Sequence, residues 1–156
     1  MNQTRFAIAI LLVFLYSCNH KPDLGKEEAA IRQLLAQERT AHFNLDTELF
    51  ISEFADSMIQ VNRGVVSSPT REQQKERIGR YFGSVEFDKW DDTAEPLIRF
   101  SDDGSLAYAI IQKEVILHYP DSTGNRFYDT ARYAWVSVYR KQNGAWKVET
   151  NISTNK

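Results

Sequence analysis

Residues 133–153, with the sequence YAWVSVYRKQNGAWKVETNIS, constrain the fold of this chain more than any other segment. Two runs of alternating apolar and polar side chains flank the tripeptide Gln142-Asn143-Gly144. Asn-Gly between such runs is a strong hairpin signal, because both residues adopt positive φ at little steric cost. We therefore predict a long C-terminal β-hairpin that turns at this tripeptide.

Side chains alternate between the two faces of each predicted strand. On the first strand, one face carries Tyr133, Trp135, Ser137 and Tyr139. On the second strand, strict alternation places together Trp146, Val148, Thr150 and Ile152. A hairpin with one aromatic face suggests a bent sheet that lines a cup, with Trp146 in the core.

The first half of the chain reads mainly as helix. Asp23 precedes a segment in which apolar residues recur at helical spacing, and Asp46 is placed to cap a shorter second helix. Thr70 and Gln73 form the capping-box pattern of a third helix. A short strand at 58–61 would separate the second helix from the third.

The second half reads as strands, at 85–90 and 94–101 (one long strand or two, interrupted near Asp91), at 105–119 and at 126–141. Helices in the first half and strands in the second predict an α+β domain, in which helices cover one face of an antiparallel sheet. Both faces of 105–119 are largely apolar, which indicates that the other face is covered too, for example by a partner subunit in a homodimer.

The N-terminus has the pattern of an export signal. Arg5 precedes an apolar run over residues 6–16, which is short for a membrane span but has the length of a signal-peptide core. The following Ser17-Cys18 resembles the lipobox of bacterial lipoproteins, in which the cysteine is acylated. An ordinary secretory signal or an N-terminal membrane anchor is the alternative. We predict a signal peptide at 1–17, a lipidated Cys18 with a tether at 18–25, a domain at 26–154, and a lipid-anchored place in the bacterial cell envelope.

Charge and residue usage argue against several classes of function. The chain has 19 Lys and Arg against 21 Asp and Glu and no basic stripe, so nucleic acid is not an expected partner. Cys18 is the single cysteine, so the domain has no thiol nucleophile or internal disulfide. His20, His42 and His118 lack ligand spacing, so no metal is expected; we place His42 at the end of the first helix as a dipole partner and His118 on the surface. The sequence has no phosphate-binding loop and no dinucleotide fingerprint, so no cofactor is expected.

Three segments carry a family resemblance: VYRKQNGAWKV at 138–148, FADSMIQVNRG at 54–64 and SDDGSLAYAI at 101–110. Together with the order of the elements, they resemble the nuclear transport factor 2-like superfamily and its uncharacterised bacterial branch, over roughly residues 27–152. The resemblance implies a cone, in which a strongly curved antiparallel sheet wraps around a long N-terminal helix (a cystatin-like roll) and leaves a pocket at its open end. Members include ketosteroid isomerases, scytalone dehydratase, polyketide cyclases and binding modules without catalysis, so the fold alone selects no function.

The catalytic members resembled here use a pocket carboxylate, or a His–Asp pair, for proton transfer next to a carbonyl. Glu114 is the candidate base in this chain, because flanking by Ile110 and Ile116 would raise its pKa. Tyr108 or Tyr133 is the candidate oxyanion donor. The alternative for Glu114 is an ordinary strand carboxylate paired with a Lys or Arg on a neighbouring strand.

Five residues are candidates for ligand binding. Arg63 precedes a turn glycine and could grip a ligand carboxylate, or could be an ordinary surface arginine. Tyr133, Trp135 and Trp90 could form an aromatic wall, or could belong to the core or a dimer interface. Gln112 shares the strand face of the candidate base.

Three functions follow, in order of preference. The first is a non-catalytic, membrane-tethered domain that binds a partner or a small apolar or mixed-polarity ligand. The second is an isomerase, dehydratase or cyclase that uses a pocket carboxylate as general base. The third is a homodimeric structural module.

Overall fold

The structure, a computed structural model, describes residues 22–153, so the predicted signal peptide and Cys18 lie outside the described residues. The long first helix, α2 (Leu24–Asn44), begins at Asp23, whose side chain accepts a hydrogen bond from the backbone N–H of Lys26. It ends where Leu45 takes a φ of 54°. The predicted cap of this helix is confirmed.

The two shorter helices also begin at the predicted caps. The Asp46 side chain accepts from the backbone N–H of Leu49 and starts α3 (Thr47–Ser52). Thr70 and Gln73 make the reciprocal bonds of a capping box and start α4 (Arg71–Phe82). Caps are correctly predicted here because each depends on residues only three positions apart.

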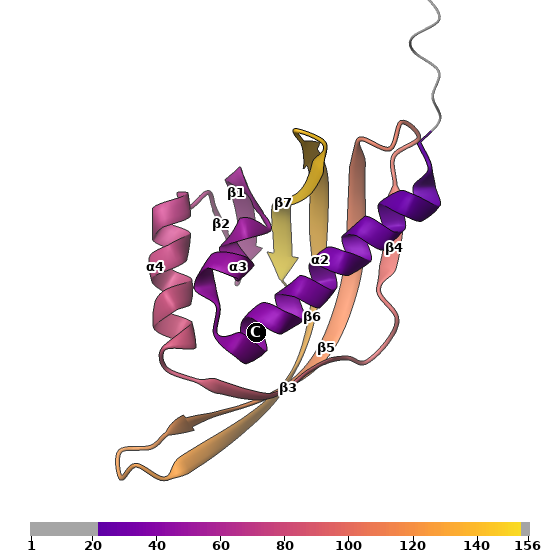
Figure 1. Cartoon of the computed structure of the whole chain (residues 1–156). Helices are drawn as coiled ribbons and strands as arrows, with labels where there is room; N and C mark the ends of the chain where they lie inside the picture. The colour runs from indigo at the N-terminus through magenta and orange to yellow at the C-terminus, as the bar shows by residue number, and fades with distance from the viewer. Residues whose placement is uncertain (1–21, 154–156) are drawn as a thin grey trace, which may run out of the picture.

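A seven-stranded curved sheet forms the rest of the domain, with strand order β2-β1-β7-β6-β5-β3 and β4 paired with β5 (Figure 1). Its strands are β1 (Phe54–Asn62), β2 (Val65–Ser67), β3 (Glu86–Asp92), β4 (Leu97–Phe100), β5 (Leu106–Pro120), β6 (Arg126–Gln142) and β7 (Ala145–Ser153). Neighbouring strands in the described part of the chain are antiparallel except β1 and β7, which run parallel. The expected α+β cone is confirmed, with a mixed rather than wholly antiparallel sheet.

The predicted interruption near Asp91 is also found. The first expected strand after α4 is divided into β3 and β4, and both lie antiparallel to β5. Helix α2 crosses the sheet obliquely on the side where α3 and α4 lie, and the far ends of β5 and β6 extend beyond the rest of the domain (Figure 1). No helix within residues 22–153 has both the length and the apolar character needed to cross a bilayer.

The C-terminal hairpin turns at Asn143 and Gly144, with φ values of 53° and 82°, as predicted. Its second strand departs from strict alternation, because Tyr139 pairs with Val148 whereas Val138 pairs with Thr150. Glu149 is therefore an extra residue, a β-bulge. Beyond it, Thr150 and Ile152 share the outer face with Val138 and Val136, and the inner positions pass to Asn151 and Ser153. The predicted face of this strand is wrong after Val148.

The core lies between α2 and the inner face of the sheet. Its buried side chains include Ile31, Leu35, Met58, Phe82, Ile111, Val115, Tyr139 and Trp146. The outer face of β5 is less covered, with Tyr108 38% and Ile110 37% exposed. Among residues 22–153, the second cover expected for β5 is not present.

Candidate functional site

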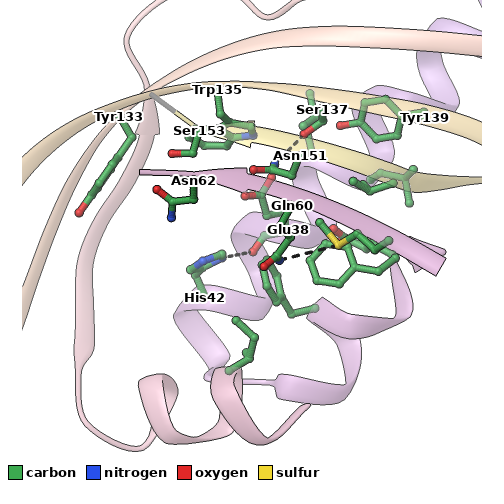
Figure 2. A pocket seen from close by; sticks show the side chains of 18 of the residues that line it. Glu38, His42, Gln60, Asn62, Tyr133, Trp135, Ser137, Tyr139, Asn151 and Ser153 are labelled. Atoms are coloured by element: carbon green, nitrogen blue, oxygen red, sulfur yellow. Dashed lines mark hydrogen bonds between the residues drawn. The ribbon is translucent and has the colours of Figure 1, made fainter. Parts of the chain in front are cut away.

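A cavity of about 510 Å³ opens between α2, α3, α4 and the sheet. Its walls are mostly apolar and aromatic, and polar side chains project into it from the strands β1, β6 and β7, from the helices α2 and α4, and from Glu53 just after α3. The labelled side chains in Figure 2 face one shared space, with Glu38 and His42 on one side and Tyr133, Trp135 and Ser153 on the other. The polar residues that line it are Glu38, His42, Glu53, Gln60, Asn62, Arg77, Tyr81, Tyr133, Ser137, Tyr139, Asn151 and Ser153.

Glu38 projects into this cavity from α2. Burial raises the pKa of its carboxyl to about 7, and the positive charge of Lys113 only partly opposes the shift. Desolvation favours the uncharged form of an acid, which is the cause here. A carboxyl group with a pKa near neutrality can both accept and release a proton at physiological pH.

Glu53 follows the last residue of α3 and is 4% exposed. Burial, with a further contribution from Glu38, raises the pKa of Glu53 to about 9, against the lowering effect of Lys147. Its Oε1 atom is buried without a hydrogen-bond partner. At neutral pH this side chain is a protonated acid, so it can donate a hydrogen bond to a molecule in the cavity.

His42 lies one helical turn after Glu38 and is 3% exposed. Its Nδ1 atom lies 2.7 Å from the main-chain carbonyl oxygen of Glu38, and because a carbonyl can only accept, Nδ1 carries the proton. Burial lowers the pKa of His42 to about 4, so the ring is neutral and Nε2 is an acceptor. The expectation that His42 is a charged partner of the helix dipole is wrong, because the ring is enclosed by aromatic side chains.

The predicted aromatic wall lies in the cavity. Trp90, Tyr133 and Trp135 all line it, and the two indole rings are 6.3 Å apart between centroids. Beside them, Asn151 Nδ2 donates a hydrogen bond to Ser137 Oγ at 3.2 Å. These placements are compatible with a ligand-binding role, which remains a prediction.

Glu114 lies elsewhere. It is on the outer face of β5, where its carboxylate accepts from Lys89 Nζ at 2.6 Å and from Arg132 at 3.1 Å. These two cations lower the pKa of Glu114, opposite to the expected direction. Tyr108 and Gln112 are on the same exposed face, so none of the three lines the cavity. The assignment of Glu114 as a pocket base is wrong, because charged partners come from both neighbouring strands.

Two further expectations need correction. Arg63 occupies the exposed turn between β1 and β2, with a φ of 50°, and does not line the cavity. His118, expected on the surface, is 7% exposed, with Nδ1 2.6 Å from Asp88 and Nε2 3.1 Å from Glu86. Among residues 22–153 there is no group of three His, Cys, Asp or Glu side chains suited to hold a metal ion.

Sequence reasoning missed both glutamates of the cavity. A signal for Glu38 was present, since Glu38 and His42 are four residues apart on a helix whose Leu34 and Leu35 also line the cavity. For Glu53 there was none, because its burial depends on how β1 leaves α3. Arg77 was also missed, although its spacing to Tyr81 puts both on one helix face.

Comparison with known proteins identifies the fold. No protein-family model matches the chain, and no curated protein matches it. Among solved structures, it is similar to an NTF2-like protein from Cytophaga hutchinsonii (17% identity, 83% of this chain and 98% of that one, TM-score 0.63). It is also similar to a ketosteroid isomerase-like protein from Erwinia carotovora atroseptica (18% identity, 82% of this chain and 96% of that one, TM-score 0.62). A third similar structure is an uncharacterised protein with a cystatin-like fold from Caulobacter vibrioides (18% identity, 83% of this chain and 89% of that one, TM-score 0.60). The chain has the NTF2-like fold. Sequence identities this low do not transfer an activity from these proteins to this chain.

Proposed function

We propose that this domain binds a small organic molecule of mixed polarity in the cavity. The observation that carries the proposal is a cavity of about 510 Å³ with apolar walls and a few inward polar groups, among them the unpartnered Oε1 of Glu53. Ligand sites in proteins have this size and composition. A buried acceptor or donor without a partner is unfavourable, and a bound ligand would supply one.

A cavity-filling variant tests the proposal. Ser137 lines the cavity, whereas the next residue, Val138, is on the opposite face of β6. Native mass spectrometry of the domain isolated from its own organism should show a retained small molecule, and Ser137→Leu should lose it. Val138→Leu is the matched control and should retain the molecule. Equal occupancy in both variants would contradict binding at this site.

A second candidate is an enzyme that moves a proton at a carbon next to a carbonyl group. Two observations favour it: a pKa of Glu38 near 7 suits a general base, and a protonated Glu53 can donate to a developing oxyanion. Neither residue is the carboxylate expected from the sequence. In this alternative, the molecule bound in the cavity would be a substrate and would react there.

The membrane tether is also proposed. It depends on the lipobox-like Leu15-Tyr16-Ser17-Cys18 after an apolar run. Acylation of Cys18 would hold the domain at a membrane of the cell envelope. Cys18→Ser should move the protein from the membrane fraction to the soluble fraction, and unchanged fractionation would contradict the anchor.

A homodimeric module is the third candidate. Supporting it, the outer face of the sheet has large apolar side chains that are partly exposed, including Tyr108, Ile110 and Ile152. Covering such a face is favourable. Light scattering on the tag-free domain should give twice the monomer mass, and Ile110→Lys should give the monomer mass.

A further inference from the structure

We propose that the ligand of the cavity is a small organic anion, an aromatic or alicyclic carboxylate or sulfonate, whose acidic group pairs with Arg77. The inference rests on the proposed function, since it names the class of molecule that the cavity takes. Its ring would lie against the aromatic wall formed by Trp90, Tyr133 and Trp135.

Arg77 is a cavity-lining cation that lacks a protein partner. Within residues 22–153, the Arg77 side chain makes no hydrogen bond, ion pair or ring contact. Most other arginines of the described chain pair with a carboxylate: Arg32, Arg39, Arg71, Arg80, Arg132 and Arg140. The partial burial of Arg77 lowers its pKa, with no neighbouring acid to offset the effect. A guanidinium group in this state is ready to accept an external anion.

The other cations of α4 are already paired. Arg71 pairs with Asp56, Lys75 with Glu48, and Arg80 with Glu76. Arg77 and Tyr81 are four residues apart and both line the cavity, so they share one face of the helix. The helix therefore presents a single uncommitted cation, and presents it to the cavity.

Three other described arginines lack a carboxylate partner, and none of them competes for this role. Arg99 donates to the main-chain carbonyl oxygen of Ile98 and does not line the cavity. Arg63 is exposed on the turn between β1 and β2, and Arg126 is exposed at the start of β6. Neither lines the cavity. The grip on a ligand acid that the sequence suggested for Arg63 is therefore reassigned to Arg77.

Charge in the cavity also sets the direction in which an anion would enter. Glu53 is buried and Glu38 faces the same interior, whereas the partly buried Arg77 keeps contact with solvent at the α4 side. An anionic group placed beside the two carboxyl groups would be repelled whenever either of them ionises. The acidic end of the ligand would thus remain at Arg77, and its uncharged end would reach Glu53 and the acceptor Nε2 of His42.

A pair of fluorescent probes separates charge recognition from hydrophobic binding. 8-Anilinonaphthalene-1-sulfonate and N-phenyl-1-naphthylamine share the same rings, but only the first carries an anion. The domain should bind the sulfonate more tightly than the neutral amine. Arg77→Gln should weaken sulfonate binding by roughly tenfold or more, the loss expected for a charge-assisted hydrogen bond. Binding of the neutral amine should stay within about twofold.

Matched variants make the result specific. Arg80→Gln removes a cation from the same helix that is paired with Glu76, and should change neither affinity. Arg77→Lys keeps the charge and should recover part of the sulfonate affinity. Ser137→Leu fills the cavity and should abolish binding of both probes.

Two outcomes would overturn the inference in different ways. If Ser137→Leu abolishes neutral-probe binding but Arg77→Gln leaves the sulfonate affinity unchanged, the cavity binds ligands and the preference for anions is wrong. If neither probe responds to Ser137→Leu, both the proposed function and this inference fail.

Discussion

The imidazole ring of His42 stacks on the indole of Trp90, with centroids 3.5 Å apart and planes 17° from parallel. The ring is also met edge-on by Phe50, Phe82 and Phe87. This surrounding is apolar, and it explains why burial lowers the pKa of His42 to about 4. A histidine four residues from a glutamate thus remains uncharged across the physiological range.

The first prediction concerns the ionisation of His42. Its ring should stay neutral, with the proton on Nδ1, down to about pH 4. Nitrogen-15 NMR of the imidazole should show this tautomer from pH 7 to pH 5, with a midpoint of protonation near pH 4. His118, between two carboxylates, provides a second ring in the same spectra. A midpoint for His42 near the ordinary histidine pKa of about 6.5 would contradict the buried stack.

The second prediction concerns stability and Glu53. The folded-state pKa of about 9 is above the ordinary value of 4.5, so the folded state holds a proton that the unfolded state releases. The free energy of unfolding should therefore fall as pH rises from about 5 towards 9. Glu53→Gln removes this penalty and should stabilise the domain, relative to the parent, by on the order of a few kcal/mol more at pH 8 than at pH 5.

Urea unfolding of the parent and Glu53→Gln at both pH values measures this difference. Comparing pH values cancels any change in packing that the amide introduces. Glu48→Gln, at an exposed ion pair with Lys75, is the control and should show a pH-dependent difference of under about 1 kcal/mol. The same difference in both variants would show that Glu53 ionises freely in the folded state.

The third prediction tests the catalytic alternative. Exchange of deuterium for the α-hydrogens of enolisable ketones, followed by NMR, should speed up as pH rises through about 7, because a base must be ionised to accept a proton. Glu38→Gln should lower the rate by about 100-fold or more. Glu114→Gln, on the outer face, should leave it unchanged. If only Glu114→Gln lowered the rate, Glu114 and not Glu38 would be the base.

The fourth prediction concerns Gly104, in the turn before β5. Its φ is 65°, and an added Cβ would lie 2.7 Å from the Cβ and Cγ atoms of Pro22. Gly104→Ala should destabilise the domain by about 2 kcal/mol or more, through backbone strain and through displacement of Pro22. Gly124, with a φ of 83° and no neighbouring atom within 4 Å, isolates the strain alone.

Urea unfolding of Gly104→Ala and Gly124→Ala makes that comparison. The Gly124 variant should lose only about 1 kcal/mol. Equal losses in the two variants would mean that the contact with Pro22 does not contribute.

The sequence predicted the features that depend on neighbours along the chain. Asp46, Thr70 and the Asn143-Gly144 turn are local signals, and all three are confirmed. The aromatic face of β6 was also predicted correctly, because Tyr133 to Tyr139 contains no bulge. Local geometry and alternation were sufficient for the α+β class, whereas the cone was expected only from the family resemblance.

The pKa values of Glu114 and Glu53 could not be predicted in this way. The pKa of Glu114 depends on Lys89 and Arg132, which come from strands on either side of it. The pKa of Glu53 depends on burial that arises only when α3 and β1 are in place. Both are properties of long-range packing, so residue type and spacing alone gave no reliable indication of them.

The extra residue at Glu149 matters for how this chain is compared with its structural neighbours. An alignment without a gap would match Thr150 and Ile152, which face outward, with positions that face the cavity in a related protein without the bulge. Placing a one-residue gap at 149 restores the correspondence and brings Asn151 and Ser153 into the compared set. Homologues should therefore be grouped by the residues at 151 and 153 once the bulge has been aligned, since shared side chains there would indicate shared ligands.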